Sequence, residues 1–270
     1  MSAAADTPVF RFDPGSTPLL ISMPHAGTYL PLAVASTMTP AALQVADTDW
    51  HVDRLYEFAR ELGIGMLTAT HSRYLIDLNR APDDRPLYPG ARNTELCPTS
   101  SFDDASIYLQ GGTPDTAGIS RRRTLYWDPY HQRLADELHS LRQRHGVALL
   151  YEAHTIRSRV PRFFEDRLPD LNLGTGGGVT ADRELEQRLL WICHAQNDYT
   201  AVLNGRFQGG YITRHYGTPA DGVHAIQLEL TQRTYMIEDP PFVYQPARAA
   251  KVRPLLRALL EAMLAWSADR

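Results

Sequence analysis

The 270-residue sequence contains few cysteines and no long apolar run, and each scarcity excludes a class of protein. Cys97 and Cys193 form no C-x-x-C pair, so we expect reduced thiols and neither a disulfide framework nor a cysteine zinc site. A membrane helix needs about 18 or more consecutive apolar residues, which the sequence lacks. The N-terminus also lacks the basic start and apolar stretch of a signal peptide. We therefore expect a cytoplasmic protein without a membrane partner.

The sequence also lacks an excess of basic charge. Its formal net charge is -4, with 27 Lys and Arg residues against 31 Asp and Glu residues. Proteins that bind nucleic acid usually carry a general positive field, so we expect no nucleic-acid partner. Any basic site must be local, which fits a small acidic molecule better than a polymer.

Composition and periodicity predict the fold class. Hydrophobic residues make up 43% of the chain, and no compositional break divides it, so we predict one domain over residues 1–270. Strand and helix patterns alternate, which predicts an α/β fold with a mixed sheet. The predicted strands cover residues 18–23, 66–69, 74–78, 147–151, 200–203 and 223–230, and the predicted helices cover residues 47–62, 124–145, 183–196 and 246–268. Two long loops are predicted at residues 81–120 and 157–178, the first being of a length typical of a lid or binding loop.

The stretch GVALLYEAH at residues 146–154 is the centre of the functional prediction. Its apolar and aromatic residues, 147–151, predict a strand buried on both faces that ends in Glu152 and His154. The strand predicted at residues 18–23 likewise runs into His25. Ligands bind beyond the carboxyl ends of the strands in open α/β sheets, so we expect the functional site there.

The two histidines suggest a metal site. A catalytic zinc ion commonly binds three His, Asp or Glu side chains and keeps one position open for water. His25, His154 and an acid of the helix after His25 fit such a set, and Asp49 and Asp53 would share one side of that helix. No compact motif such as H-E-x-x-H is present, so the alternative that both histidines are ordinary loop or capping residues stays open.

Further polar residues stand within or beside predicted strands. Glu229 lies in the apolar run VHAIQLEL, where a buried carboxylate needs a partner, so it is either a catalytic base or a salt-bridge residue. An edge strand that exposes Glu229 to water is the alternative. Arg73, Asn79 and Arg80 indicate carboxylate recognition, because a guanidinium group binds a carboxylate with two hydrogen bonds. A structural ion pair with Asp77 is the alternative for these residues.

Several sequence blocks occur in one order along residues 18–238. They are S-x-P-H-x-G, D-T-D-W-H-V-D-R-L-Y, S-R-Y-L-I-D-L-N-R, E-A-H-T, G-G-Y-I-T-R-H-Y-G and G-V-H-A-I-Q-L-E-L. Together they resemble the N-formylglutamate deformylase (N-formylglutamate amidohydrolase) family over nearly the whole chain. The resemblance implies a zinc-carboxypeptidase-like, three-layer α/β/α fold. It also implies hydrolysis of N-formyl-L-glutamate to L-glutamate and formate, the last step of a histidine-degradation route.

The resemblance assigns chemical roles to four residues. His25 and His154 match the metal histidines of the family, which implies one Zn²⁺ per chain, with other divalent metals possible. Arg73 would polarise the scissile carbonyl, and Glu229 would be the general base. The expected chemistry is therefore metal-dependent hydrolysis of an amide.

The resemblance also implies how the substrate is held. Asn79 and Arg80 match the Asn-Arg pair with which the related aspartoacylases bind a substrate carboxylate. Because N-formylglutamate carries two carboxylates, we predict that Arg214 binds the second. Carboxypeptidase-like sites take their second metal ligand from H-x-x-E, and this sequence has no glutamate three residues after the first histidine. We predict Asp53, in preference to Asp49, as the acidic ligand.

Two other classes of function fit the same residues. A binding protein for an acidic metabolite would keep the arginines but would need neither a metal nor Glu229. Another zinc deacylase or peptidase, acting on a different small acidic N-acyl amino acid, would keep the whole site. The sequence predicts no particular oligomeric state.

Overall fold

A computed structural model describes residues 7–88, 90 and 92–270. Its centre is a seven-stranded sheet in the order β1-β3-β2-β4-β7-β5-β6. The strands are β1 (Phe10–Asp13), β2 (Leu19–Met23), β3 (Gly65–Ala69), β4 (Ala148–Ile156), β5 (Leu171–Gly174), β6 (Ala201–Leu203) and β7 (Val223–Thr231). β2 is parallel to β3 and β4, β4 is parallel to β7, and β5 is parallel to β6, whereas β1 and β5 run antiparallel to β3 and β7. The predicted mixed sheet is confirmed.

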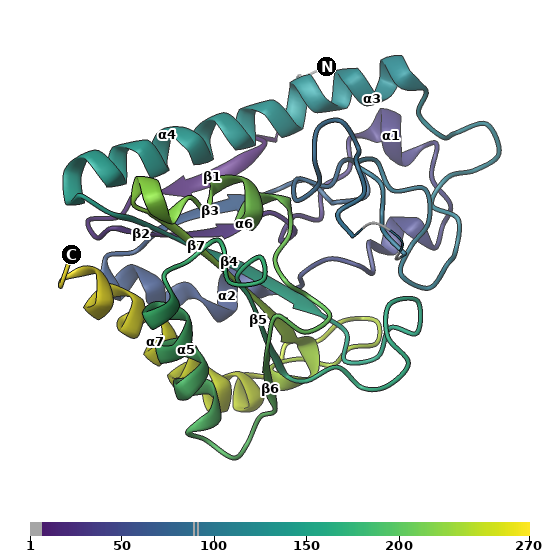
Figure 1. The fold of residues 1–270 in the computed structure, drawn as a ribbon. Coiled ribbons are helices and arrows are strands. Elements are labelled where there is room, and N and C mark those ends of the chain that lie inside the picture. Colours follow the sequence, from purple (N-terminus) through teal and green to yellow (C-terminus); the bar gives the residue numbers. More distant parts are fainter. Residues whose placement is uncertain (1–6, 89, 91) are drawn as a thin grey trace.

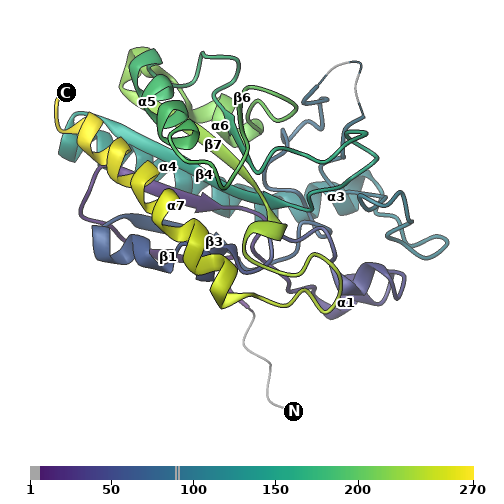
Figure 2. The ribbon, with the colours of Figure 1, turned by 90° about the horizontal axis from the view of Figure 1, so that it is seen from below.

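Helices cover both faces of this sheet (Figure 1). One face carries a long rod made of α3 (Thr116–Arg122), the π-helical segment η3 (Arg123–Trp127) and α4 (Asp128–His145), together with α6 (Tyr211–Tyr216). The opposite face carries α2 (Val52–Leu55), α5 (Arg183–His194) and α7 (Pro246–Ser267), of which α5 and α7 pack against each other (Figure 2). Shorter segments are α1 (Leu32–Ala35), η1 (Ala42–Gln44), η2 (Glu57–Leu62), η4 (Pro219–Asp221) and η5 (Gln232–Thr234). The three layers agree with the expected α/β/α class.

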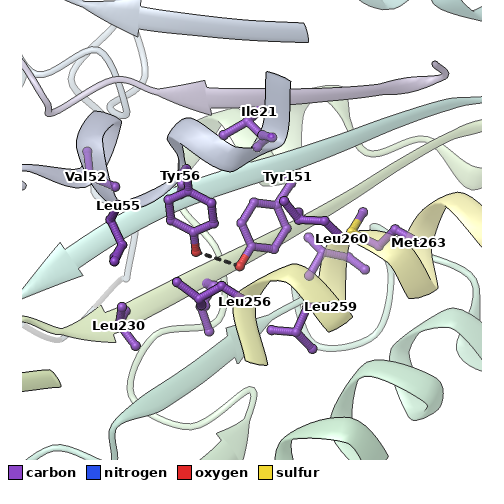
Figure 3. Packing of buried hydrophobic residues seen from close by; sticks show 14 of the residues in the cluster. Ile21, Val52, Leu55, Tyr56, Tyr151, Leu230, Leu256, Leu259, Leu260 and Met263 are labelled. Atoms are coloured by element: carbon purple, nitrogen blue, oxygen red, sulfur yellow. Dashed lines mark hydrogen bonds between the residues drawn. The ribbon is translucent and has the colours of Figure 1, made fainter. Parts of the chain in front are cut away.

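Side chains alternate across the strands and so fill two separate cores. Leu19 and Ile21 of β2 pack in the cluster that includes α7, while Leu20 packs in the cluster that includes α4. Every residue of β4 is buried, as expected for a parallel strand with helices on both faces. On the α7 side, the hydroxyl groups of Tyr56 and Tyr151 form a 2.9 Å hydrogen bond among apolar side chains (Figure 3). One hydroxyl donates and the other accepts, so the bond offsets part of the cost of burying them.

Residues 74–78 lie in turns and irregular backbone, so the strand predicted there is wrong. Leu75 N donates to Ser72 O at 2.9 Å, and Asn79 N donates to the Asp77 carboxylate at 2.9 Å. These local bonds occupy groups that a strand would present to its neighbours. A buried loop and a buried strand share the same apolar composition, which explains the error.

The helix predicted at residues 47–62 begins only at Val52 and continues, after a break, as the 3-10 helix η2. His51, which precedes it, has a φ of 61°, outside the helical region. Residues 47–50 therefore form a loop before the helix. Strand β5 was also missed, since it lies inside the loop predicted at residues 157–178.

Loops from distant parts of the sequence gather at one end of the sheet, beyond the carboxyl ends of β2 and β4 (Figure 1). They include the described parts of residues 70–115 and residues 157–170 and 204–210. The C-terminus lies at the other end of the sheet (Figure 1). Across the described ranges, no helix has both the length and the apolar character that a bilayer crossing requires.

Candidate active site

Neighbouring strands bring polar side chains to the loop end of the sheet. His25 follows β2 by two residues, His154 lies in β4, and Glu229 is its register partner in β7. β4 continues to Ile156, so His154 lies inside the strand rather than beyond it. The rings of His25 and His154 have centroids 4.8 Å apart. Alternation places His154 and Glu229 on the sheet face that α4 and α6 cover.

His25, Asp49 and His154 form a buried group that can hold a metal ion, with one ligand atom of each residue within 4.8 Å of the others. Asp49 Oδ2 lies 2.9 Å from His154 Nδ1 and 3.8 Å from His25 Nδ1. Within the described residues, His25 Nδ1 is buried without a hydrogen-bond partner, which a bound cation would remedy. Burial lowers the pKa of His25 to about 4, so its imidazole is neutral, as a metal ligand must be. Two imidazole nitrogens and a carboxylate oxygen suit Zn²⁺.

Asp77 orients both His25 and Arg73. Its Oδ1 lies 2.7 Å from His25 Nε2, and its Oδ2 accepts a hydrogen bond from an Arg73 NH2 group at 2.6 Å. Burial raises the pKa of Asp77, but the charge of Arg73 and the hydrogen bond with His25 bring it well below the usual range, so the group is ionised. Because Asp77 holds Nε2, the His25 ring presents Nδ1 to the metal group.

Asp53, the predicted acidic ligand, lies apart from the two histidines, so that prediction is corrected to Asp49. The Asp53 side chain is 44% exposed, and its carboxylate pairs with Arg11 at 2.8 Å. The two acids do not share a helix, because Asp49 lies in the loop before α2. Asp49 N donates to His25 O at 3.0 Å, and this loop contact brings the Asp49 carboxylate to the metal group.

Asp49→Asn is therefore expected to weaken metal binding by more than about tenfold, because a neutral amide oxygen is a poorer ligand for a divalent cation than a carboxylate. Asp53→Asn, the matched control, should leave metal affinity unchanged. Metal content after dialysis and competition with a chelator measure both variants. Full affinity in Asp49→Asn, or metal loss in Asp53→Asn, would reverse the assignment.

Glu229 is buried in β7, which lies between β4 and β5. The alternative of an edge strand that exposes Glu229 to water is therefore wrong. Burial and the nearby charge of Asp49 raise the pKa of Glu229 well above its usual range, while Arg73 and Arg80 act in the opposite direction. A carboxyl group with a raised pKa binds a proton more strongly, which suits a group that takes up a proton and later returns it.

One cavity connects the metal group, Glu229 and several arginines. Its lining includes His25, Arg73, Asn79, Arg80, Arg92, His154, Arg206 and Glu229. Sequence analysis missed Arg92 and Arg206. Both lie in loops, where no periodicity distinguishes an inward-facing position from an outward-facing one.

Asn79 and Arg80 lie in the wall of the cavity beside the metal group. Asn79 Nδ2 is 2.9 Å from His154 Nε2. Arg80 donates to Thr94 Oγ1 from NH2 at 2.7 Å and from Nε at 3.1 Å. In the described part of the chain, no carboxylate lies within 4.0 Å of Arg80, and burial lowers its pKa. A half-buried guanidinium without an anionic partner attracts an anion, so this wall is suited to a bound carboxylate.

Arg214, the predicted partner of a second carboxylate, does not line this cavity. Its Nε donates to Gly209 O at 2.9 Å, and its guanidinium lies 5.0 Å from the Tyr88 ring centroid. It borders a separate hollow together with Arg85 and His215. Arg214 lies on helix α6, whose residues Tyr211, Arg214 and His215 all border that separate hollow. The prediction for Arg214 is therefore corrected.

Comparison with known proteins places nearly the whole chain beside relatives of one name. The family model described as N-formylglutamate amidohydrolase matches residues 17–236. A protein of Pseudomonas aeruginosa called N-formylglutamate deformylase is 50% identical over 262 residues, which cover 97% of this chain and 98% of that protein. One of the same name from Pseudomonas putida is 48% identical over 264 residues, again 97% and 98% of the two chains.

Two solved structures share the fold. The crystal structure of an N-formylglutamate amidohydrolase from Ralstonia eutropha has a TM-score of 0.79 and 26% identity, over 96% of this chain and 97% of that one. A gene product of Agrobacterium tumefaciens has a TM-score of 0.76 over 99% of both chains. Its identity of 16% supports likeness of fold alone.

Proposed function

The chain belongs to the N-formylglutamate amidohydrolase family, and we propose that it hydrolyses N-formyl-L-glutamate to L-glutamate and formate. The observation that carries the proposal is one cavity lined by His25 and His154 of the metal group, by Glu229, and by arginines without a carboxylate partner in the described residues. An acidic substrate with a cleavable amide fits this cavity. The guanidinium groups would bind its carboxylates, and the metal group and Glu229 would act on its amide. The activity is that of an amidohydrolase, and the histidine-degradation route and the cytoplasm are its proposed setting.

We propose one Zn²⁺ per chain, held by His25, Asp49 and His154, although another divalent ion could occupy the same ligands. The buried His25 Nδ1, which has no hydrogen-bond partner in the described residues, supports this assignment. When bound, the ion supplies positive charge that polarises a carbonyl group and lowers the pKa of water toward roughly 7.

Residues of the chain perform the remaining steps. Glu229 removes a proton from the attacking water as the water oxygen bonds to the formyl carbon. Arg73, held by Asp77 at 2.6 Å, donates hydrogen bonds to the negative charge that develops on the carbonyl oxygen. Glu229 then gives the proton to the amide nitrogen as the C–N bond breaks. Formate and L-glutamate leave, and Glu229 is again a carboxylate.

Asn79 and Arg80 hold the carboxylate next to the scissile amide. Asn79 contacts His154, so a carboxylate bound here lies beside the metal group. That carboxylate and the amide nitrogen are attached to the same carbon of the substrate, which makes the two positions compatible. Fixing this carboxylate would orient the formyl carbon toward the attacking water.

A formate-release assay coupled to metal analysis tests the proposal. We expect about one equivalent of divalent metal per chain, release of formate from N-formyl-L-glutamate, and slower cleavage of N-acetyl-L-glutamate. Removal of the metal with a chelator should abolish turnover, and added Zn²⁺ should restore it. Tight binding of N-formylglutamate without turnover would instead support a metabolite-binding protein. Faster cleavage of an acetyl or peptide substrate would support another deacylase or a peptidase.

A further inference from the structure

Two arginines that line the cavity, Arg92 and Arg206, have charges that the proposed mechanism does not use. Arg206 lies in the loop between β6 and α6 and lines the cavity together with Arg73, Arg80 and Arg92. We propose that Arg206 binds the side-chain carboxylate of the substrate and thereby selects acidic N-formyl amino acids. The proposal rests on the function given above and replaces the role predicted for Arg214.

The charge of Arg206 is not compensated by an acid in the described residues. Its Nε donates to Phe163 O at 3.0 Å, and its NH2 group lies 3.5 Å from Arg92 O. Both acceptors are neutral carbonyl groups, and no carboxylate of the described residues lies within 4.0 Å. The guanidinium is therefore held in place while its charge stays available to an anion.

Aromatic rings lie around this guanidinium. Its centre lies 5.2 Å from the centroid of the Tyr88 ring and 5.5 Å from the centroids of Phe163 and Phe207. All three rings line the same cavity. Cation–π contact with rings restricts the rotamers of a long side chain. Arg206 thus loses little conformational entropy when it binds a carboxylate.

The other arginines of the cavity have partners that exclude them from this role. Arg73 is paired with Asp77 at 2.6 Å, and Arg92 is paired with Asp104 at 3.0 Å. The side chain of Arg92 is also 63% exposed, which weakens its attraction for an anion. Arg80 is assigned to the carboxylate beside the amide.

The positions of the two remaining guanidinium groups match the two ends of the substrate. Arg80 follows Asn79, which contacts His154, whereas the contacts of Arg206 are with the outer loops that carry Tyr88, Arg92 and Phe163. In N-formylglutamate, one carboxylate shares a carbon with the scissile amide and the other lies two methylene groups further away. The near carboxylate therefore fits Arg80, and the far one fits Arg206.

Arg206→Gln tests the proposal with two substrates of the same shape, N-formyl-L-glutamate and N-formyl-L-glutamine. We expect kcat/KM for N-formyl-L-glutamate to fall by about a hundredfold, because a charge-assisted pair of hydrogen bonds is lost. For N-formyl-L-glutamine, kcat/KM should change by less than about threefold, since its side-chain amide makes no such pair. For Arg206→Lys, kcat/KM for N-formyl-L-glutamate should lie between the values for Arg206→Gln and the wild type. Arg214→Gln, which changes an arginine outside the cavity, is the matched control. It should keep the wild-type preference for N-formyl-L-glutamate over N-formyl-L-glutamine.

The outcomes separate the two proposals. Equal loss on both substrates would show that Arg206 only supports the loop that carries Phe163, and unchanged kinetics would remove it from recognition. If the wild type releases no formate from N-formyl-L-glutamate, the proposed function fails. The role of Arg206 is then judged by binding alone: calorimetry should show that Arg206→Gln weakens L-glutamate but not L-glutamine, and equal binding of L-glutamate to variant and wild type would overturn it.

Discussion

Glu229→Gln is expected to lower kcat for formate release by about a hundredfold or more, because a neutral amide cannot accept the proton of the attacking water. The substitution keeps the size of the side chain, and β7 buries it between β4 and β5, so the fold should be preserved. Metal content should also be preserved, since Glu229 is not among the three ligand residues. Single-turnover measurement of formate release gives the rate of the chemical step, and metal analysis gives the metal content of the same variant.

Glu152→Gln is a matched control for this variant. Glu152 is also buried on the same face of the sheet, and its Oε1 accepts a hydrogen bond from Ser22 at 2.9 Å. Burial raises the pKa of Glu152 well above its usual range, as it does for Glu229, but Glu152 does not line the cavity. We expect a far smaller change in kcat than in Glu229→Gln. A Glu229→Gln enzyme with near wild-type kcat would exclude Glu229 as the base.

His25→Ala and His154→Ala are each expected to lose most of the bound metal as well as activity, because two remaining protein ligands hold a divalent ion poorly. We expect this loss because both imidazoles lie close to the Asp49 carboxylate, where a metal ion would bind all three side chains. Metal content after dialysis and the affinity from chelator competition give a result that does not depend on turnover. We expect metal affinity to fall by at least about a hundredfold.

His215→Ala is the corresponding control, since His215 lies on α6 and borders the separate hollow rather than the cavity. It should retain the metal. If His25→Ala or His154→Ala kept full metal occupancy, the ligand set would have to be reassigned. Activity lost with the metal still bound would instead indicate a role for that histidine in substrate binding.

The site residues that the sequence could predict lie mostly in strands or directly after them. β2, β4 and β7 were recognised because buried apolar runs interrupted by polar residues are rare. His25, His154 and Glu229 lie in or directly after those runs, so their convergence follows from the sheet. The burial of Glu229 was also foreseeable, because its flanking leucines favour the interior.

The site residues that the sequence could not predict lie in loops. Asp49 reaches the histidines through a loop that replaces the expected first turn of a helix, and that loop depends on the unusual backbone of His51. Arg206 reaches the cavity because residues 204–210 contact Phe163 and Tyr88, which are distant in sequence. Contacts of this kind leave no periodic pattern, and the six-residue helix α6 was not among the predicted helices.

The hydrogen bond between Arg206 Nε and the carbonyl oxygen of Phe163 has an evolutionary consequence. A carbonyl acceptor is part of the main chain, so mutation of the side chain at position 163 does not remove it. A change of side chain at position 163 would therefore remove one ring contact but leave this hydrogen bond in place. New selectivity could arise by replacing a single loop cation, without change to the strands that hold His154 and Glu229. Chemistry and recognition would then evolve as separable traits within one fold.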